Sequence, residues 1–171
     1  RGRGFAAGAV MSTRAPVDPG RGNGTLRVIV DALGGDRAPA QPVAGAVRAA
    51  RRFPDTTIML SGPEDLIRAE LKSNGACPPN VGIAPASQSI AMHESPVRAL
   101  REKRDSSIGV GLASVADGTA DAFVSAGNTG AVVAASSLGL GLIEGVQRPG
   151  IAVPIVAIDR PVVIIDAGAN I

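Results

Sequence analysis

Short apolar runs alternate with segments of helical spacing along most of this chain of 171 residues. The runs are rich in Val and Ile and stay apolar throughout, whereas half-exposed strands alternate apolar with polar residues. Between the runs lie segments whose apolar residues recur every three or four positions, as on one face of a helix. This alternation predicts a mostly parallel sheet covered by helices on both faces. The expected fold class is therefore α/β, in three layers, α/β/α.

The boundaries follow from the apolar runs and from the Gly, Pro and Asn residues between them. The longest uncharged stretch, residues 122–143, contains Asn128, Thr129, three Ser and four Gly. It predicts a buried helix after a polar loop, in preference to a membrane span. We expect strands at residues 26–31, 57–61, 81–84, 121–125, 151–157 and 162–165, and helices near residues 39–53, 63–74, 95–100, 108–118 and, after the loop 126–130, to about 143.

Composition limits the classes of function. Residues 1–25 hold four Arg and one Asp, and predict a disordered leader ahead of a folded domain at residues 26–171. A secretory signal is the alternative, but the apolar stretch at residues 5–10 is shorter than a signal core. Beyond the leader no positive charge remains in excess, and the chain has three Phe, no Tyr and no Trp, so nucleic-acid binding is not expected. One Cys and one His leave no basis for a disulfide or a metal cluster.

Three predicted strands end in glycine-containing loops: Asp31–Asp36, Ser125–Ala131 and Asp166–Asn170. The carboxyl ends of parallel strands share one edge of a sheet, where such folds bind ligands. Glycine lets backbone approach a ligand, and the N–H groups that begin the next helix attract anions. The alternative is that Gly and Asn only shape the turns. Neither the Walker A sequence nor the G-x-G-x-x-G spacing occurs, so nucleotide binding has no specific support.

A second candidate is the segment Lys103–Ser107, where two cations precede Asp-Ser-Ser. The cations could attract an anionic substrate, or the Asp-Ser-Ser could cap the helix predicted to begin near Ile108. Both interpretations remain open at this stage.

The loops together resemble the phosphate acyltransferase (PlsX) family of bacterial phospholipid synthesis. The matching segments are Asp-Ala-Leu-Gly-Gly-Asp at 31–36, Lys-Arg-Asp-Ser-Ser-Ile at 103–108, Ala-Asp-Ala-Phe-Val-Ser-Ala-Gly-Asn-Thr-Gly-Ala at 120–131, Arg-Pro at 148–149 and Asp-Ala-Gly-Ala-Asn at 166–170. Leu33 stands where the family has Met. The resemblance covers residues 26–170 and implies the N-terminal half of a longer catalytic domain, incomplete at its C-terminus.

The resemblance implies a Rossmann-like fold similar to those of phosphotransacetylases and the isocitrate and isopropylmalate dehydrogenases. It implies acyl transfer from acyl-[acyl-carrier-protein] to inorganic phosphate, with no cofactor or metal. It further implies a cytoplasmic homodimer in peripheral contact with the membrane, with a downstream glycerol-3-phosphate acyltransferase using the product.

Because phosphate is itself the nucleophile, the reaction needs anion and oxyanion donors rather than a Ser-His or Cys-His pair. Asp31 and Asp36 would orient these donors, and Lys103 and Arg104 would neutralise charge. The expected catalytic residues are Asn128, Thr129, Asn170, Lys103 and Asp36, and the expected substrate-binding residues are Gly34, Gly35, Arg104, Ser106, Ser125, Gly127, Gly130, Asp166 and Gly168.

Two alternatives remain. One is a phosphotransacetylase-like enzyme that uses acyl-CoA. A carrier protein needs a basic docking patch, which Arg98, Arg101, Lys103 and Arg104 offer, although solvated helix charges explain these residues equally well. The other is a truncated, non-catalytic module that binds anions.

Overall fold

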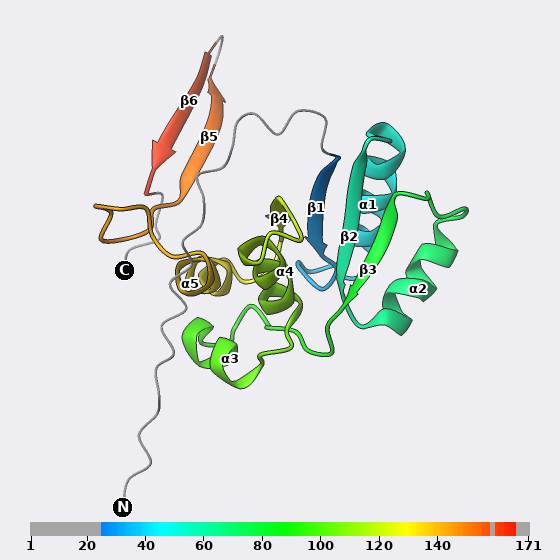
Figure 1. Cartoon of the computed structure of the whole chain (residues 1–171), viewed down its shortest axis with the longest axis horizontal. Helices are drawn as coiled ribbons and strands as arrows, with labels where there is room; N and C mark the ends of the chain where they lie inside the picture. Colours follow the sequence, from blue (N-terminus) through cyan, green and yellow to red (C-terminus); the bar gives the residue numbers. More distant parts are fainter. Residues whose placement is uncertain (1–24, 158–159, 167–171) are drawn as a thin grey trace, which may run out of the picture.

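Four strands form a parallel sheet in the order β3-β2-β1-β4 (Figure 1). The computed structural model describes residues 25–157 and 160–166, so the predicted leader lies almost wholly outside the described residues. All three strand pairings are parallel, and Val30 of β1 lies opposite both Leu60 of β2 and Val124 of β4. The strands are β1 (Leu26–Asp31), β2 (Thr56–Gly62), β3 (Val81–Pro85) and β4 (Ala122–Val124).

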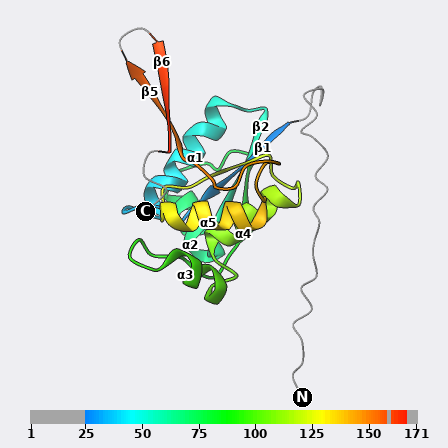
Figure 2. The same cartoon turned by 90° about the vertical axis from the view of Figure 1, so that its left-hand side faces the viewer.

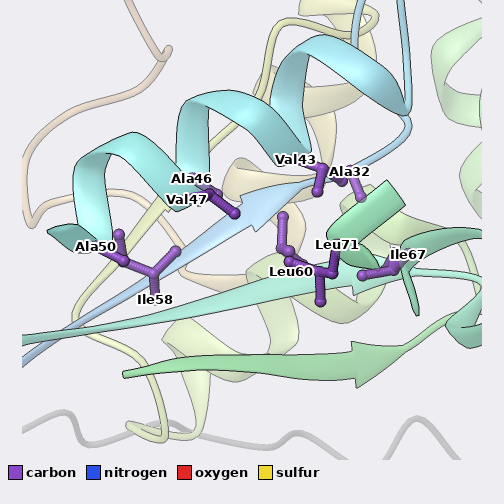
Figure 3. Close-up of a cluster of buried hydrophobic side chains, with 9 residues drawn as sticks. All are labelled: Ala32, Val43, Ala46, Val47, Ala50, Ile58, Leu60, Ile67 and Leu71. Carbon is purple, nitrogen blue, oxygen red and sulfur yellow. The ribbon is translucent and has the colours of Figure 1, made fainter. Parts of the chain in front are cut away.

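Helices cover both faces of this sheet. On one face α1 and α2 pack over β1 to β3 around a core of nine buried side chains, which Figure 3 shows between α1 and the strands. On the other face α4 covers Ile29, and α5 packs against α3 and α4. The helices are α1 (Ala40–Arg52), α2 (Glu64–Ser73), α3 (Pro96–Glu102), α4 (Ser107–Ala116) and α5 (Thr129–Gly139). The expected α/β class with helix layers around a parallel sheet is confirmed.

The last two strands do not join the parallel sheet. β5 (Ala152–Ala157) and β6 (Arg160–Ile165) pair with each other antiparallel, and both views show this hairpin projecting away from the helices (Figures 1 and 2). The expectation that these runs extend the parallel sheet is wrong. Each observed strand contains a proline, Pro154 in β5 and Pro161 in β6, and a proline cannot donate to the ladder of a central strand.

The prediction for α5 was too long, since the helix ends at Gly139 and not near Ile143. Gly141 has a φ of +76°, which a continuing right-handed helix does not allow. Only Ala131 and Ala135 of this helix are buried, so the expected burial holds for one narrow stripe. No helix in the described part of the chain combines the length and the apolar character that a membrane crossing needs.

Close packing of α4 on β4 depends on Gly111. A Cβ at this position would overlap the ring of Phe123, whereas a Cβ at Gly45 in α1 would meet nothing within 4 Å. We expect Gly111→Ala to lower the free energy of unfolding by about 1–3 kcal/mol through overpacking. Gly45→Ala, the matched control, should raise it by about 0.5–1 kcal/mol through helix propensity. Urea denaturation of both variants tests this, and shifts of the same sign would contradict it.

Candidate functional site

The direction in which successive strands are added to the sheet reverses between β1 and β4. From β1 the sheet grows through β2 to β3 on one side, and β4 then adds on the other side of β1. Such a reversal leaves a crevice at the carboxyl ends of the two strands on either side of it, β1 and β4, where open α/β sheets bind ligands. The loops that follow Asp31 and Val124 both begin at this point, so the structure brings together the first two glycine loops.

A buried carboxylate connects these loops. The Ser125 hydroxyl donates to Asp31 Oδ2 at 2.7 Å, and the backbone N–H of Leu33 donates to Asp31 Oδ1 at 3.0 Å. The N–H of Gly127 in turn donates to Ser125 Oγ at 3.0 Å. Asp31 is only 2% exposed, so its two oxygens serve groups of the protein. Asp31 therefore fixes the Ser125 side chain and, through it, the start of the second loop.

Glycine is required where the two loops touch. A Cβ on Gly34 would lie 2.8 Å from Asp31 Oδ2 and 2.9 Å from the Gly127 nitrogen. A Cβ on Gly127 would lie 3.1 Å from both Asp31 Oδ2 and Ser125 Oγ. Gly34 and Gly127 thus allow the two loops to pack closely against each other. Gly35 has a φ of +93° and serves the turn, and a Cβ on Gly130 would lie 2.7 Å from Pro96 Cγ of α3.

Asn128 is the N-cap of α5, and its side chain is fully used inside the protein. Oδ1 accepts from the N–H of Ala131 at 3.0 Å. Nδ2 lies 3.0, 3.3 and 3.2 Å from the carbonyl oxygens of Ala91, Met92 and Glu94, to which it donates. The residue is 6% exposed. Asn128 therefore attaches the turn at residues 91–94 to the start of α5. Sequence alone could not reveal this, because the three carbonyls lie 34–37 residues upstream.

Thr129 and Gly130 differ from Asn128 in both exposure and bonding. They are exposed, and among the described residues neither their backbone N–H groups nor the Thr129 hydroxyl has a hydrogen-bond partner. They are the first residues of a helix, where backbone donors point outward and the helix dipole favours an anion. Of the residues predicted to bind phosphate, these two present free donors at the switch point.

Lys103 and Ser106 lie next to this region, in contacts of their own. Lys103 Nζ donates to Glu94 Oε1 at 2.6 Å and to the carbonyl of Ser89 at 2.8 Å, so Glu94 neutralises its charge. Ser106 is fully buried as the N-cap of α4, with Oγ accepting from the N–H of Gly109, which confirms the capping interpretation. Arg104 is exposed and forms no ion pair in the described part of the chain.

The third glycine loop does not leave the same sheet edge. β6 belongs to the separate hairpin, so the expectation of three loops on one edge holds for the first two only. Asp166, with a φ of +66°, lies beside Gly150 and Ile151 at the base of that hairpin. Gly168 and Asn170 lie outside the described residues. Asp36 is exposed after Gly35, on the rim of an apolar trough.

This trough, which we did not predict, begins at the site and runs along β1 beneath α1. Its volume is about 840 Å³, and Asp31 and Ser125 lie at one end. Leu26, Val28 and Val30 are alternate residues of β1 and line the trough from the same side of the strand. The apolar run at residues 26–30 did signal a buried strand, but not that one face of it would be left open.

The pKa of Glu94 lies below its usual range, chiefly because Lys103 donates a hydrogen bond to its carboxylate and also because the N–H of Ala91 does so. A lowered folded-state pKa means that the ionised pair stabilises the fold above the unfolded pKa of about 4.3 and ceases to do so as the pH falls through the lower folded value. We expect acidification from about pH 5 to about pH 3 to lower the melting temperature less in Glu94→Gln than in the unaltered chain. Melting curves across this range test the prediction, and equal pH dependence of the two proteins would contradict it.

Comparisons with known proteins identify the family of this chain. A sequence model of the family described as "Fatty acid synthesis protein" matches residues 26–171. Three curated relatives are each named phosphate acyltransferase. Identity is 43% over 145 residues for that of Desulfitobacterium hafniense strain DSM 10664 / DCB-2, 41% over 146 for that of Halothermothrix orenii and 45% over 146 for that of Heliobacterium modesticaldum. Each match covers 85% of this chain and 43–44% of the relative, so the chain spans about two fifths of their length. The chain therefore belongs to the fatty acid synthesis protein family.

Proposed function

We propose that residues 26–171 form the phosphate-binding part of an enzyme that transfers an acyl group from a thioester to inorganic phosphate. The observation that carries the proposal is the pair of exposed donors at Thr129 and Gly130, which have no hydrogen-bond partner among the described residues and lie at the switch point of a chain whose relatives are named phosphate acyltransferases. The helix N-terminus supplies N–H groups for phosphate oxygens. Ser125, Asp31 and Asn128 act as positioning residues that hold this terminus in place.

The reaction needs no nucleophile from the protein. A phosphate oxygen attacks the thioester carbonyl carbon, a C–O bond forms, and the carbonyl oxygen becomes an oxyanion. The intermediate collapses as the C–S bond breaks, and the sulfur leaves as a thiolate that takes a proton from solvent. The products are an acyl phosphate and a free thiol. Fixed N–H and hydroxyl donors favour this course by holding phosphate near the carbonyl and by stabilising the oxyanion.

The acyl carrier protein remains our proposed acyl donor, and coenzyme A is the alternative. Of the four cations that could form a docking patch, Arg98 pairs with Glu102 and Lys103 pairs with Glu94. Arg101 and Arg104 stay exposed and unpaired among the described residues, which leaves a smaller basic surface for an acidic carrier. The homodimer, the cytoplasmic location, the peripheral membrane contact and the downstream glycerol-3-phosphate acyltransferase all stay predictions.

A chimera tests the proposal, with residues 26–171 in place of the matched 145 residues of the D. hafniense relative. We expect it to form acyl phosphate, trapped as the hydroxamate, from palmitoyl-[acyl-carrier-protein] and phosphate. Faster reaction with palmitoyl-CoA would favour the phosphotransacetylase-like alternative. A folded chimera that binds phosphate and forms no product, beside an active D. hafniense enzyme, would favour the non-catalytic module.

A further inference from the structure

No element among residues 25–157 and 160–166 covers the apolar trough along β1. Its floor is the face of β1 and β4 that carries Val28, Val30 and Val124, and α1 forms one wall. α1 and α2 contact β1, β2 and β3, while the principal helix contacts of β4 are with α4 on the opposite face. Leu26 is 50% exposed, Val124 is 53% exposed, and Phe53 at the end of α1 is 57% exposed. Among the described residues, the sheet face beside α1 is thus apolar and open over β1 and the edge strand β4.

Parallel strands are normally buried on both faces, because the layers of an α/β fold pack helices on each side of the sheet. An open apolar strip over β1 and β4, beside α1 in the same helix layer, has the character of a face that one further helix would cover. β1 has six residues, so the strip is about 20 Å long. A helix rises about 1.5 Å per residue, and about 13 residues would therefore span the strip.

The wall formed by α1 is shaped for close approach by a second helix. Gly45 lies in the middle of α1 and lines the trough, and a Cβ there would meet nothing within 4 Å. Glycine is unfavourable inside a helix, and nothing in the described chain requires it at this position. With Ala46 and Ala49 it leaves the middle of the wall without long side chains, while Gln41 and Phe53 lie at its two ends. Such a wall lets a neighbouring helix pack at the short end of the usual axial separation of about 8–10 Å.

We propose that this trough is the seat of an amphipathic helix supplied by the part of the family's chain that lies outside the matched residues. More than half of each relative's length lies outside the match, which is ample for such a helix. Apolar side chains of the helix would meet Val28, Val30 and Val124. Its outer face would be polar, like Asp36, Arg37 and Gln41 on the rim. The site end of the trough would then be closed beside Ser125.

Complex formation tests this without any measurement of acyl transfer, so the result stands apart from the proposed function. The full 171-residue chain is co-expressed with the part of the D. hafniense relative outside its matched 145 residues, as a separate polypeptide. We expect a one-to-one complex in sedimentation. Gly45→Leu, which fills the trough, should weaken the complex at least 10-fold while the chain alone keeps or raises its melting temperature. Gly139→Leu is the matched control, since a Cβ there also meets nothing within 4 Å, and it should leave the complex unchanged.

Three outcomes would overturn the proposal. A complex with Gly45→Leu as tight as that with the unaltered chain would place the added polypeptide elsewhere. Failure of the unaltered chain to form a complex would also contradict the proposal. Binding of palmitate in place of a complex, with an affinity that Gly45→Leu lowers, would make the trough a lipid site.

Discussion

Asn128→Ala is expected to lower the free energy of unfolding of the chain by about 2–4 kcal/mol. Loss of an N-cap costs about 0.5–2 kcal/mol, and each net hydrogen bond about 0.5–1.5 kcal/mol. Asn128 both caps α5 and donates to three carbonyls in residues 91–94, and these carbonyls would be left without that donor. Urea denaturation monitored by circular dichroism measures the effect.

Two further variants separate the contributions of this side chain. Asn128→Ser keeps a capping oxygen but loses Nδ2, so it should recover only the capping part of the loss. Ser106→Ala removes a cap that makes one hydrogen bond, to the N–H of Gly109, and should cost about 1 kcal/mol. If Asn128→Ala cost no more than Ser106→Ala, the bonds to residues 91–94 would contribute nothing.

The strands and helices of the parallel sheet could be predicted from local sequence because their apolar residues match the faces that the fold buries, and because strand and helix alternate along the chain. Strand β1 is an apolar run followed by a glycine turn, and α2 follows its N-cap Pro63 with Glu64 and Asp65 beside the positive end of its dipole. The same reasoning did not predict the separate hairpin of β5 and β6. Its apolar runs resemble central strands, and pairing partners are not encoded in one strand alone. Pro154 and Pro161 were the residues that could have indicated that these strands are not central strands of a sheet.

In the site, too, some contacts could be predicted from the sequence and others could not. The contact between Asp31 and Ser125 spans 94 residues, yet it could be anticipated, because carboxyl ends of neighbouring parallel strands meet at one edge. The role of Asn128 could not, since its partners lie in an irregular turn that no periodicity marks. Lys103 was a candidate for substrate charge, and only the fold reveals that Glu94 already neutralises it.

Asn128 and Thr129 are adjacent and were both predicted to be catalytic, and the structure now separates them. The side chain of Asn128 is buried and bonded, whereas Thr129 is exposed with its hydroxyl and N–H free of partners among the described residues. A hydroxyl that contacts phosphate or the oxyanion should matter for turnover and little for folding. Replacing Thr129 thus tests an effect on turnover separately from an effect on folding stability.

Thr129→Val keeps the shape of the side chain and removes its hydroxyl. In the chimera we expect turnover to fall by about 10²–10³-fold, the usual cost of one transition-state donor, or about 3–4 kcal/mol. The melting temperature should change little, because no bond within the described protein is lost. Thr129→Ser, which restores the hydroxyl, should recover most of the activity. Hydroxamate trapping gives the rate and thermal melting of the same samples gives the stability. Near-normal turnover in a folded Thr129→Val enzyme would remove the Thr129 hydroxyl from the site and leave phosphate to the backbone N–H groups that begin α5.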